Sequence, residues 1–139
     1  MWQSLFKNRY RIYLFAHIIV ILLVTILFQV ISERKIAALF AGSLFLLSPL
    51  VVLFFEFKSK VLLKRISTYG VLIFLVISAI PILYLRLANW SEEFGTLTLF
   101  GFSGVQLHQL SNKIFILMLV CFLVDAFREE LKLRKEPGK

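Results

Sequence analysis

Long stretches of uncharged residues alternate with short polar clusters along this chain. Residues 12–31 and 36–55 contain no charged side chain, and in residues 66–86 the only charge is at the last position. At 1.5 Å per helical residue, about 20 residues cross the roughly 30 Å hydrocarbon layer of a membrane. The pattern therefore predicts transmembrane helices over 12–31, 36–55 and 66–86.

The fourth apolar stretch is less sharply bounded. Its uninterrupted part, 114–124, is too short to cross a membrane, so we place the fourth helix at 107–127, where it takes in polar residues at both ends. Residues 88–112 carry three glycines and many polar side chains, which is typical of a long loop on the outer side. Residues 128–139 mix acidic and basic side chains, which indicates a cytoplasmic tail that continues the last helix.

The composition agrees with a protein built for lipid. With 60% hydrophobic and 17% charged residues, the chain lies outside the range of soluble globular domains. We expect residues 1–139 to form a single all-α domain, an integral membrane four-helix bundle. The net charge of +8 does not indicate nucleic-acid binding, because the basic residues lie at the ends of apolar stretches and not along one surface stripe.

The basic residues predict how this bundle is oriented. Twelve of the sixteen Lys and Arg side chains lie on the side of the two termini, and four lie on the other side: Arg34, Lys35, Arg86 and Lys113. The positive-inside rule then predicts that both termini are cytoplasmic and that the chain spans the inner (cytoplasmic) membrane of a cell. We expect its first partner to be the lipid bilayer, with anionic headgroups at the cytoplasmic face.

Several side chains are candidates for packing or for contact with another subunit. Ala38 and Gly42 lie one turn apart in the second stretch and form a small face that allows another helix to approach closely. Trp90 follows the third stretch, at the level where aromatic side chains anchor a helix in the interface. Asp125 precedes Arg128 by three residues, the spacing of an ion pair on one helix face.

Two prolines interrupt the apolar stretches. Pro49 and Pro81 each remove one backbone donor from a helix, so we expect a kink at both. The hydroxyl of Ser43 or Ser48 near the first, and of Ser78 near the second, could bond to a freed carbonyl.

The sequence argues against catalysis and against classical transport. The middle thirds of the first three stretches contain no ionisable side chain, whereas proton relays and ion pathways need such groups near the membrane centre. Glu56, just past the second stretch, is expected to be neutralised at the interface by Lys58 and Lys60. No paired nucleophile and base, phosphate-binding glycine loop or metal-spaced cluster is present in the sequence. We therefore predict that the chain is not an enzyme.

Two histidines are candidates for cofactor binding. His17 lies about five residues inside the first helix, and His108 opens the fourth. The plain interpretations are a packing histidine and an interfacial histidine, and the alternative is that either binds a metal or haem.

These histidines, the Ala79-Ile80-Pro81 stretch, the glycine-containing loop 88–112 and Leu107 before His108 resemble bacterial four-helix cytochrome b561-type proteins. The resemblance implies a four-helix membrane architecture and bis-histidine haem b, with His17 and His108 as ligands. Two further histidine positions of that family are occupied here by the stretch Arg34-Lys35-Ile36 and by Phe122.

We predict a small non-catalytic membrane protein that needs no cofactor and acts as an accessory or assembly subunit of a membrane complex, or as a homo-oligomer. One alternative is an electron-transfer protein of the cytochrome b561 type, with haem b held by His17 and His108 and shared with a partner or second copy. Another is a small oligomeric pore or immunity-type protein. If the chain has a site, we expect it between Trp90 and Lys113.

Overall fold

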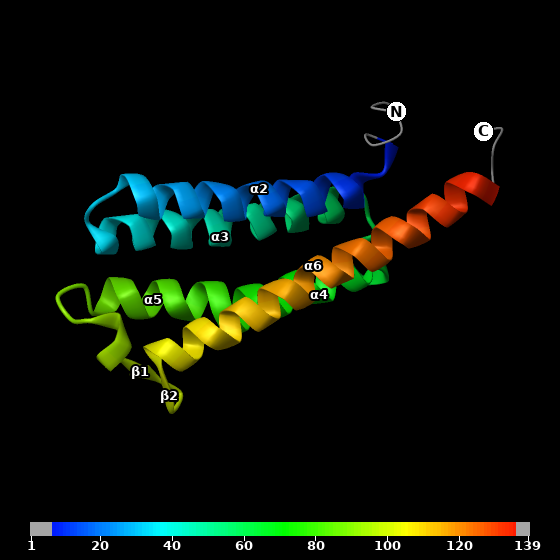
Figure 1. Ribbon diagram of the computed structural model, residues 1–139. Helices are drawn as coiled ribbons and strands as arrows, with labels where there is room; N and C mark the ends of the chain where they lie inside the picture. Colours follow the sequence, from blue (N-terminus) through cyan, green and yellow to red (C-terminus); the bar gives the residue numbers. More distant parts are fainter. Residues whose placement is uncertain (1–6, 136–139) are drawn as a thin grey trace.

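A computed structural model describes residues 7–135 of the chain, and most of them are helical (Figure 1). Four helical segments are long and apolar enough to cross a membrane, which confirms that part of the sequence prediction. They are α2 (Arg9–Val30), α3 (Arg34–Lys58), the segment Ile66–Ala88 and α6 (Gly104–Lys135). The third segment has three parts: α4 (Ile66–Phe74), the π-helical turn η2 (Leu75–Ala79) and α5 (Ile80–Ala88).

The helices are arranged as two antiparallel hairpins that lie one on the other (Figure 1). In the first, α2 and α3 are joined by residues 31–33; in the second, the segment α4–η2–α5 packs beside α6. The hairpins are connected through the short 3-10 helix η1 (Leu62–Lys64). We call the end of the molecule that holds this connection and both ends of the described chain the terminus end, and the opposite end the loop end.

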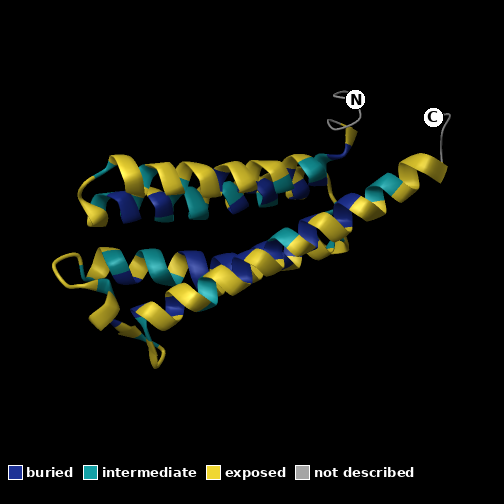
Figure 2. Ribbon diagram, viewed as in Figure 1, coloured by how far each residue is buried: buried dark blue, intermediate teal, exposed yellow. Residues whose placement is uncertain are grey.

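The exposed faces of these helices are apolar. Buried residues lie where the helices face one another, and exposed residues cover the outward faces (Figure 2). Large hydrophobic side chains such as Ile19, Leu22, Phe54 and Val76 are more than half exposed. Outward apolar faces of this extent suit contact with lipid and not with water.

The third segment widens before Pro81. Within η2 the hydrogen bonds span five residues, and the N–H of Ile80 bonds to the carbonyl of Leu75. A π-turn of this kind accommodates a proline that cannot donate to the preceding turn. The Ser78 hydroxyl donates to Ser111 on α6 and not to a backbone carbonyl. The expectation that Ser78 bonds to the carbonyl freed by Pro81 is therefore wrong.

The serines near Pro49 also do not have the expected role. α3 runs through Pro49 as one helix. The hydroxyl of Ser43 donates to Leu39 in its own helix at 2.8 Å, and that of Ser48 has no hydrogen-bond partner among the described residues. Neither serine therefore bonds to the carbonyl that the proline frees.

The fourth helix is longer than its apolar stretch indicated. It begins at Gly104, so the predicted loop 88–112 was too long and its last part is helical. Ser103 and Gln106 explain the early start. The Ser103 hydroxyl accepts from the N–H of Gln106 at 3.3 Å, and the Gln106 side chain accepts from the N–H of Ser103 at 2.9 Å. This reciprocal capping box satisfies free donors of the first helical turn.

The connection before α6, residues 89–103, is ordered by local contacts. It contains the 3-10 helix η3 (Phe94–Thr96) and a hairpin of two short antiparallel strands, β1 (Thr98–Leu99) and β2 (Phe102–Ser103). The two residues between the strands both have positive φ, 53° at Phe100 and 81° at Gly101, as a type I′ turn requires. Under this hairpin a small apolar cluster forms from Leu85, Leu97 and Leu107.

A buried charged cluster joins α2 to α3 at the terminus end. The Glu56 carboxylate on α3 is fully buried. It accepts hydrogen bonds from the hydroxyls of Tyr10 at 3.0 Å and Tyr13 at 3.1 Å, and it pairs with Arg9 at 3.2 Å. The expectation that Lys58 and Lys60 neutralise Glu56 at the interface is therefore wrong. We call Arg9, Tyr10, Tyr13 and Glu56 the clamp.

Two further buried contacts reinforce the same end. Asn8 accepts from the N–H of Tyr10 as the N-cap of α2, and its amide donates to the carbonyl of Ala126 on α6 at 2.7 Å. Asp125 accepts from the N–H and the hydroxyl of Ser67 at 2.8 Å and 2.7 Å. Asp125 also forms the predicted ion pair with Arg128, at 3.9 Å. Its closest contacts are at the N-terminus of α4, where a negative charge is favourable.

The clamp leads to a prediction about stability. Removing the Glu56 carboxylate leaves the buried hydroxyls of Tyr10 and Tyr13 without their acceptor, at a total cost of about 2–4 kcal/mol, whereas Arg9 is partly exposed and can reach solvent. We expect Glu56→Ala to lower the free energy of unfolding by that amount, measured by SDS titration of the purified protein in mixed micelles. Glu33→Ala, at an exposed residue that makes no capping hydrogen bond, is the matched control. Equal stability of the two variants would contradict a stabilising role for the clamp.

The start of α6 gives a second prediction. A Cβ added at Gly104 would lie 2.0 Å from the carbonyl oxygen of Phe94, whereas a Cβ at Gly95 would come no closer than 3.8 Å to its nearest neighbour. We therefore expect Gly104→Ala to lower the melting temperature in detergent, because the loop must move away from the helix, and Gly95→Ala to leave it nearly unchanged. Equal melting temperatures for the two variants would show that the loop does not pack on α6 in this way.

Candidate functional site

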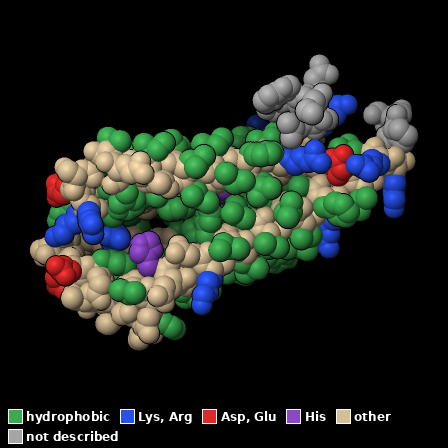
Figure 3. Space-filling view, in the orientation of Figure 1, with side chains coloured by type: hydrophobic (Ala, Val, Ile, Leu, Met, Phe, Trp, Pro, Cys, Tyr) green, Lys and Arg blue, Asp and Glu red, His purple; other side chains and the backbone are tan. Residues whose placement is uncertain are grey.

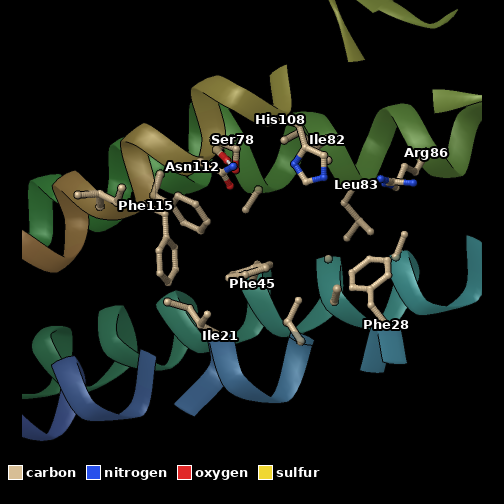
Figure 4. Close-up of a pocket in the computed structure, with 18 residues that line it drawn as sticks. Ile21, Phe28, Phe45, Ser78, Ile82, Leu83, Arg86, His108, Asn112 and Phe115 are labelled. Atoms are coloured by element: carbon tan, nitrogen blue, oxygen red, sulfur yellow. Dashed lines mark hydrogen bonds between the residues drawn. The ribbon is translucent and has the colours of Figure 1, made fainter. Parts of the chain in front are cut away.

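The two hairpins separate toward the loop end and enclose a cleft. The inner part of this cleft is a cavity of about 430 Å³ to which all the long helical segments contribute. Figure 4 shows Ile21, Phe28 and Phe45 on one side of it, with Leu83, Asn112 and Phe115 on the other. This volume lies within the range of about 300–1,000 Å³ that small-molecule sites occupy.

Aromatic side chains close the cleft toward the terminus end. The ring of Phe115 on α6 lies 5.2 Å from that of Phe45 and 5.3 Å from that of Phe74, both edge to face. Phe74 and Phe115 belong to the buried core that continues to the clamp. The cleft is therefore closed at its inner end by a packed aromatic floor.

The first hairpin supplies a wall of small side chains. Ala38 and Ala41 are each 5% exposed and line the cavity. At Gly42, an added Cβ would lie 3.1 Å from the Leu83 methyl group on the opposite wall. Larger side chains at these positions would fill the space between the hairpins, so the small face predicted at Ala38 and Gly42 lines a cleft inside the chain.

Polar groups lie along the second hairpin. Ser78 and Ser111, hydrogen-bonded to each other, and Asn112 line the inner part of the cavity. Nearer the loop end, Arg86 and His108 line both this part and the next. The surface of the cleft thus changes from apolar at the floor to polar toward the loop end.

The mouth of the cleft is charged. It forms a second cavity of about 510 Å³ that shares Phe28, Ala38, Arg86 and His108 with the first. Its charged lining residues are Arg34 and Lys35 from the start of α3, Arg86 from α5, and Glu92 and Glu93 from the loop. In Figure 3, basic side chains and a histidine edge a hollow between the hairpins at the loop end.

These mouth charges are not paired with one another. Every ion pair within residues 7–135 lies toward the terminus end, and none includes a charge of the mouth. The guanidinium of Arg86 lies 4.1 Å from the centre of the Phe94 ring and is half-buried. Its N–H groups make no side-chain hydrogen bond or ion pair within the described part of the chain, so they remain available to a ligand.

Apart from His17, the predicted site residues lie in three different settings. Ala38, Gly42 and His108 line the inner cavity, and Trp90, which is 41% exposed, lines the mouth. Asp125 lies at the other end of α6 and holds the start of α4. The predicted segment from Trp90 to Lys113 therefore contributes one side of the cleft but not the whole of it.

His17 lies away from the cleft, inside the core. Its Nδ1 lies 2.7 Å from the carbonyl oxygen of Tyr13, and its ring lies 5.0 Å from that of Phe122. Phe122 follows His108 by 14 residues, which is about 21 Å along a helix. The two histidines are not brought together, and no group of three or more metal-ligating side chains occurs within residues 7–135. Haem binding stays a prediction from the resemblance.

Arg34, Lys35 and Arg86 are the residues that the sequence interpretation missed, because it used them only as topology markers. The sequence did contain a signal for them. Only four basic residues lie on the side away from the termini, and these are three of the four. Basic residues are disfavoured on the outer side of a membrane, so their presence indicates a role if this side is the outer one. Their assembly at one mouth depends on how the hairpins pack.

The arrangement is suited to binding an amphipathic molecule. Its floor is apolar and aromatic, and its mouth carries charges of both signs. Such a gradient of polarity matches an amphipathic molecule. No protein-family model, curated protein or solved structure matches this chain.

Proposed function

We propose that this chain is a non-catalytic integral membrane protein, a four-helix bundle with both termini in the cytoplasm, that binds one lipid molecule in the cleft between its hairpins. The observation that carries the proposal is the cleft itself, with an apolar floor and a charged mouth. An accessory subunit of this kind would act by holding a lipid in place, and would need neither a cofactor nor catalytic residues.

Access from the membrane supports a lipid as the ligand. The hollow between the hairpins opens on the side of the molecule seen in Figure 3, where apolar side chains surround it. An acyl chain could therefore enter from the hydrocarbon layer while its headgroup stays at the loop end. A water-soluble ligand that entered through the mouth would meet apolar and aromatic side chains at the floor.

Native mass spectrometry of the purified protein in mild detergent tests this proposal. We expect wild-type protein to retain one phospholipid, and Ala41→Leu to retain at least about tenfold less, because the larger side chain fills the cleft. Ala16→Leu, the same substitution at an exposed residue of α2, is the control and should retain the wild-type amount. Wild-type protein without lipid, or equal retention by the two folded variants, would contradict the proposal.

Fluorescence provides a second measurement in case Ala41→Leu does not fold, since overpacking costs about 1–3 kcal/mol. The chain has two tryptophans, so Trp2→Phe leaves Trp90 at the mouth as the only one. A phospholipid brominated close to the headgroup should quench Trp90 at a lower lipid fraction than one brominated at the chain end. The opposite order would mean that no headgroup is held at the mouth.

A further inference from the structure

Charges of both signs line the mouth without pairing. Arg34, Lys35 and Arg86 share this cavity with Glu92 and Glu93, and no ion pair within residues 7–135 joins any of them. Elsewhere the same chain pairs its charges closely, as at Arg65 and Glu129. The unpaired charges of the mouth therefore provide positions for both an anion and a cation on one ligand.

The basic side is suited to a phosphate. Arginine presents a planar fork of donors that matches two phosphate oxygens, and the ring of Phe94, 4.1 Å from the Arg86 guanidinium, supports that fork on one side. His108 lines the boundary between mouth and apolar cavity next to it. A phosphate held by Arg86 would thus lie where an acyl chain leaves the polar mouth and enters the cleft.

The acidic side distinguishes between phosphate headgroups. Glu92 and Glu93 are exposed residues of the loop that line the same cavity as Arg86. Their carboxylates would repel a headgroup that is only anionic, and they would accept hydrogen bonds from a primary ammonium, which has three donors. A quaternary ammonium has no N–H donor and would gain only the charge attraction.

We infer that the cleft selects a zwitterionic phospholipid whose headgroup is a phosphoethanolamine, with a primary amine. This inference rests on the proposed function. The phosphate lies against Arg86 with Arg34 and Lys35 nearby, and the ammonium lies against Glu92 and Glu93. One acyl chain extends past His108 toward the aromatic floor.

The test uses delipidated full-length protein in detergent and three phospholipids with identical acyl chains. By native mass spectrometry, we expect phosphatidylethanolamine to bind about tenfold more tightly than phosphatidylglycerol or phosphatidylcholine. Glycerophosphoethanolamine, which lacks acyl chains, should not compete at similar concentrations. Competition by this soluble ester would overturn the assignment to a lipid.

Variants separate the two halves of the headgroup site. Arg86→Gln should weaken binding of both phosphatidylethanolamine and phosphatidylglycerol about tenfold. The double variant Glu92→Gln/Glu93→Gln should weaken phosphatidylethanolamine and strengthen phosphatidylglycerol, which reverses the preference. Lys113→Gln removes a basic residue that does not line the cleft and should change neither.

Two outcomes would overturn this inference while leaving the proposed function in place. One is equal binding of all three lipids, and the other is a preference for phosphatidylglycerol. Both require that Ala41→Leu still abolishes binding. Binding that Ala41→Leu does not reduce would instead overturn the proposed function together with this inference.

Discussion

The structure depends on how one buried carboxylate is neutralised. Glu56 on α3 is fully buried, and an uncompensated charge there would cost several kcal/mol. On α2, Arg9 pairs with this carboxylate and the hydroxyls of Tyr10 and Tyr13 donate to it. These contacts fix α2 and α3 to each other at this level. The guanidinium of Arg65, 5.1 Å from the Tyr10 ring, also pairs with a glutamate on α6. The contact thereby extends to the second hairpin.

This concentration of polar contacts at one end explains the space at the other. At the loop end the hairpins meet through Gly42 and Leu83, with alanines around them, and no ion pair of the described chain draws them together. The aromatic floor around Phe115 marks the change from packed core to open cleft. The molecule is thus closed where its charges are paired and open where they are not. The proposed ligand would occupy that open part.

The sequence predicted the four long apolar helices because length and hydrophobicity alone determine them. The predicted start of α6 was too late, because it was based on the apolar stretch alone. The capping pair Ser103 and Gln106, which can be identified in the sequence, marks the true start. The partners of Glu56 could not be predicted, because 46 and 43 residues separate it from the two tyrosines. The cleft was also beyond prediction. Ala38 and Gly42 indicated close approach, but only the packing of the hairpins shows that they border a space.

Photocrosslinking shows whether an acyl chain lies between the hairpins. A phospholipid with a photoactivatable group at its chain end is added to the purified protein, irradiated, and its adducts are mapped by mass spectrometry. With an acyl chain in the cleft, we expect adducts concentrated at the floor, on Phe45 and Phe115. Adducts spread evenly over outward residues such as Ile19 and Ile77, which are 54% and 46% exposed, with none at the floor, would contradict it.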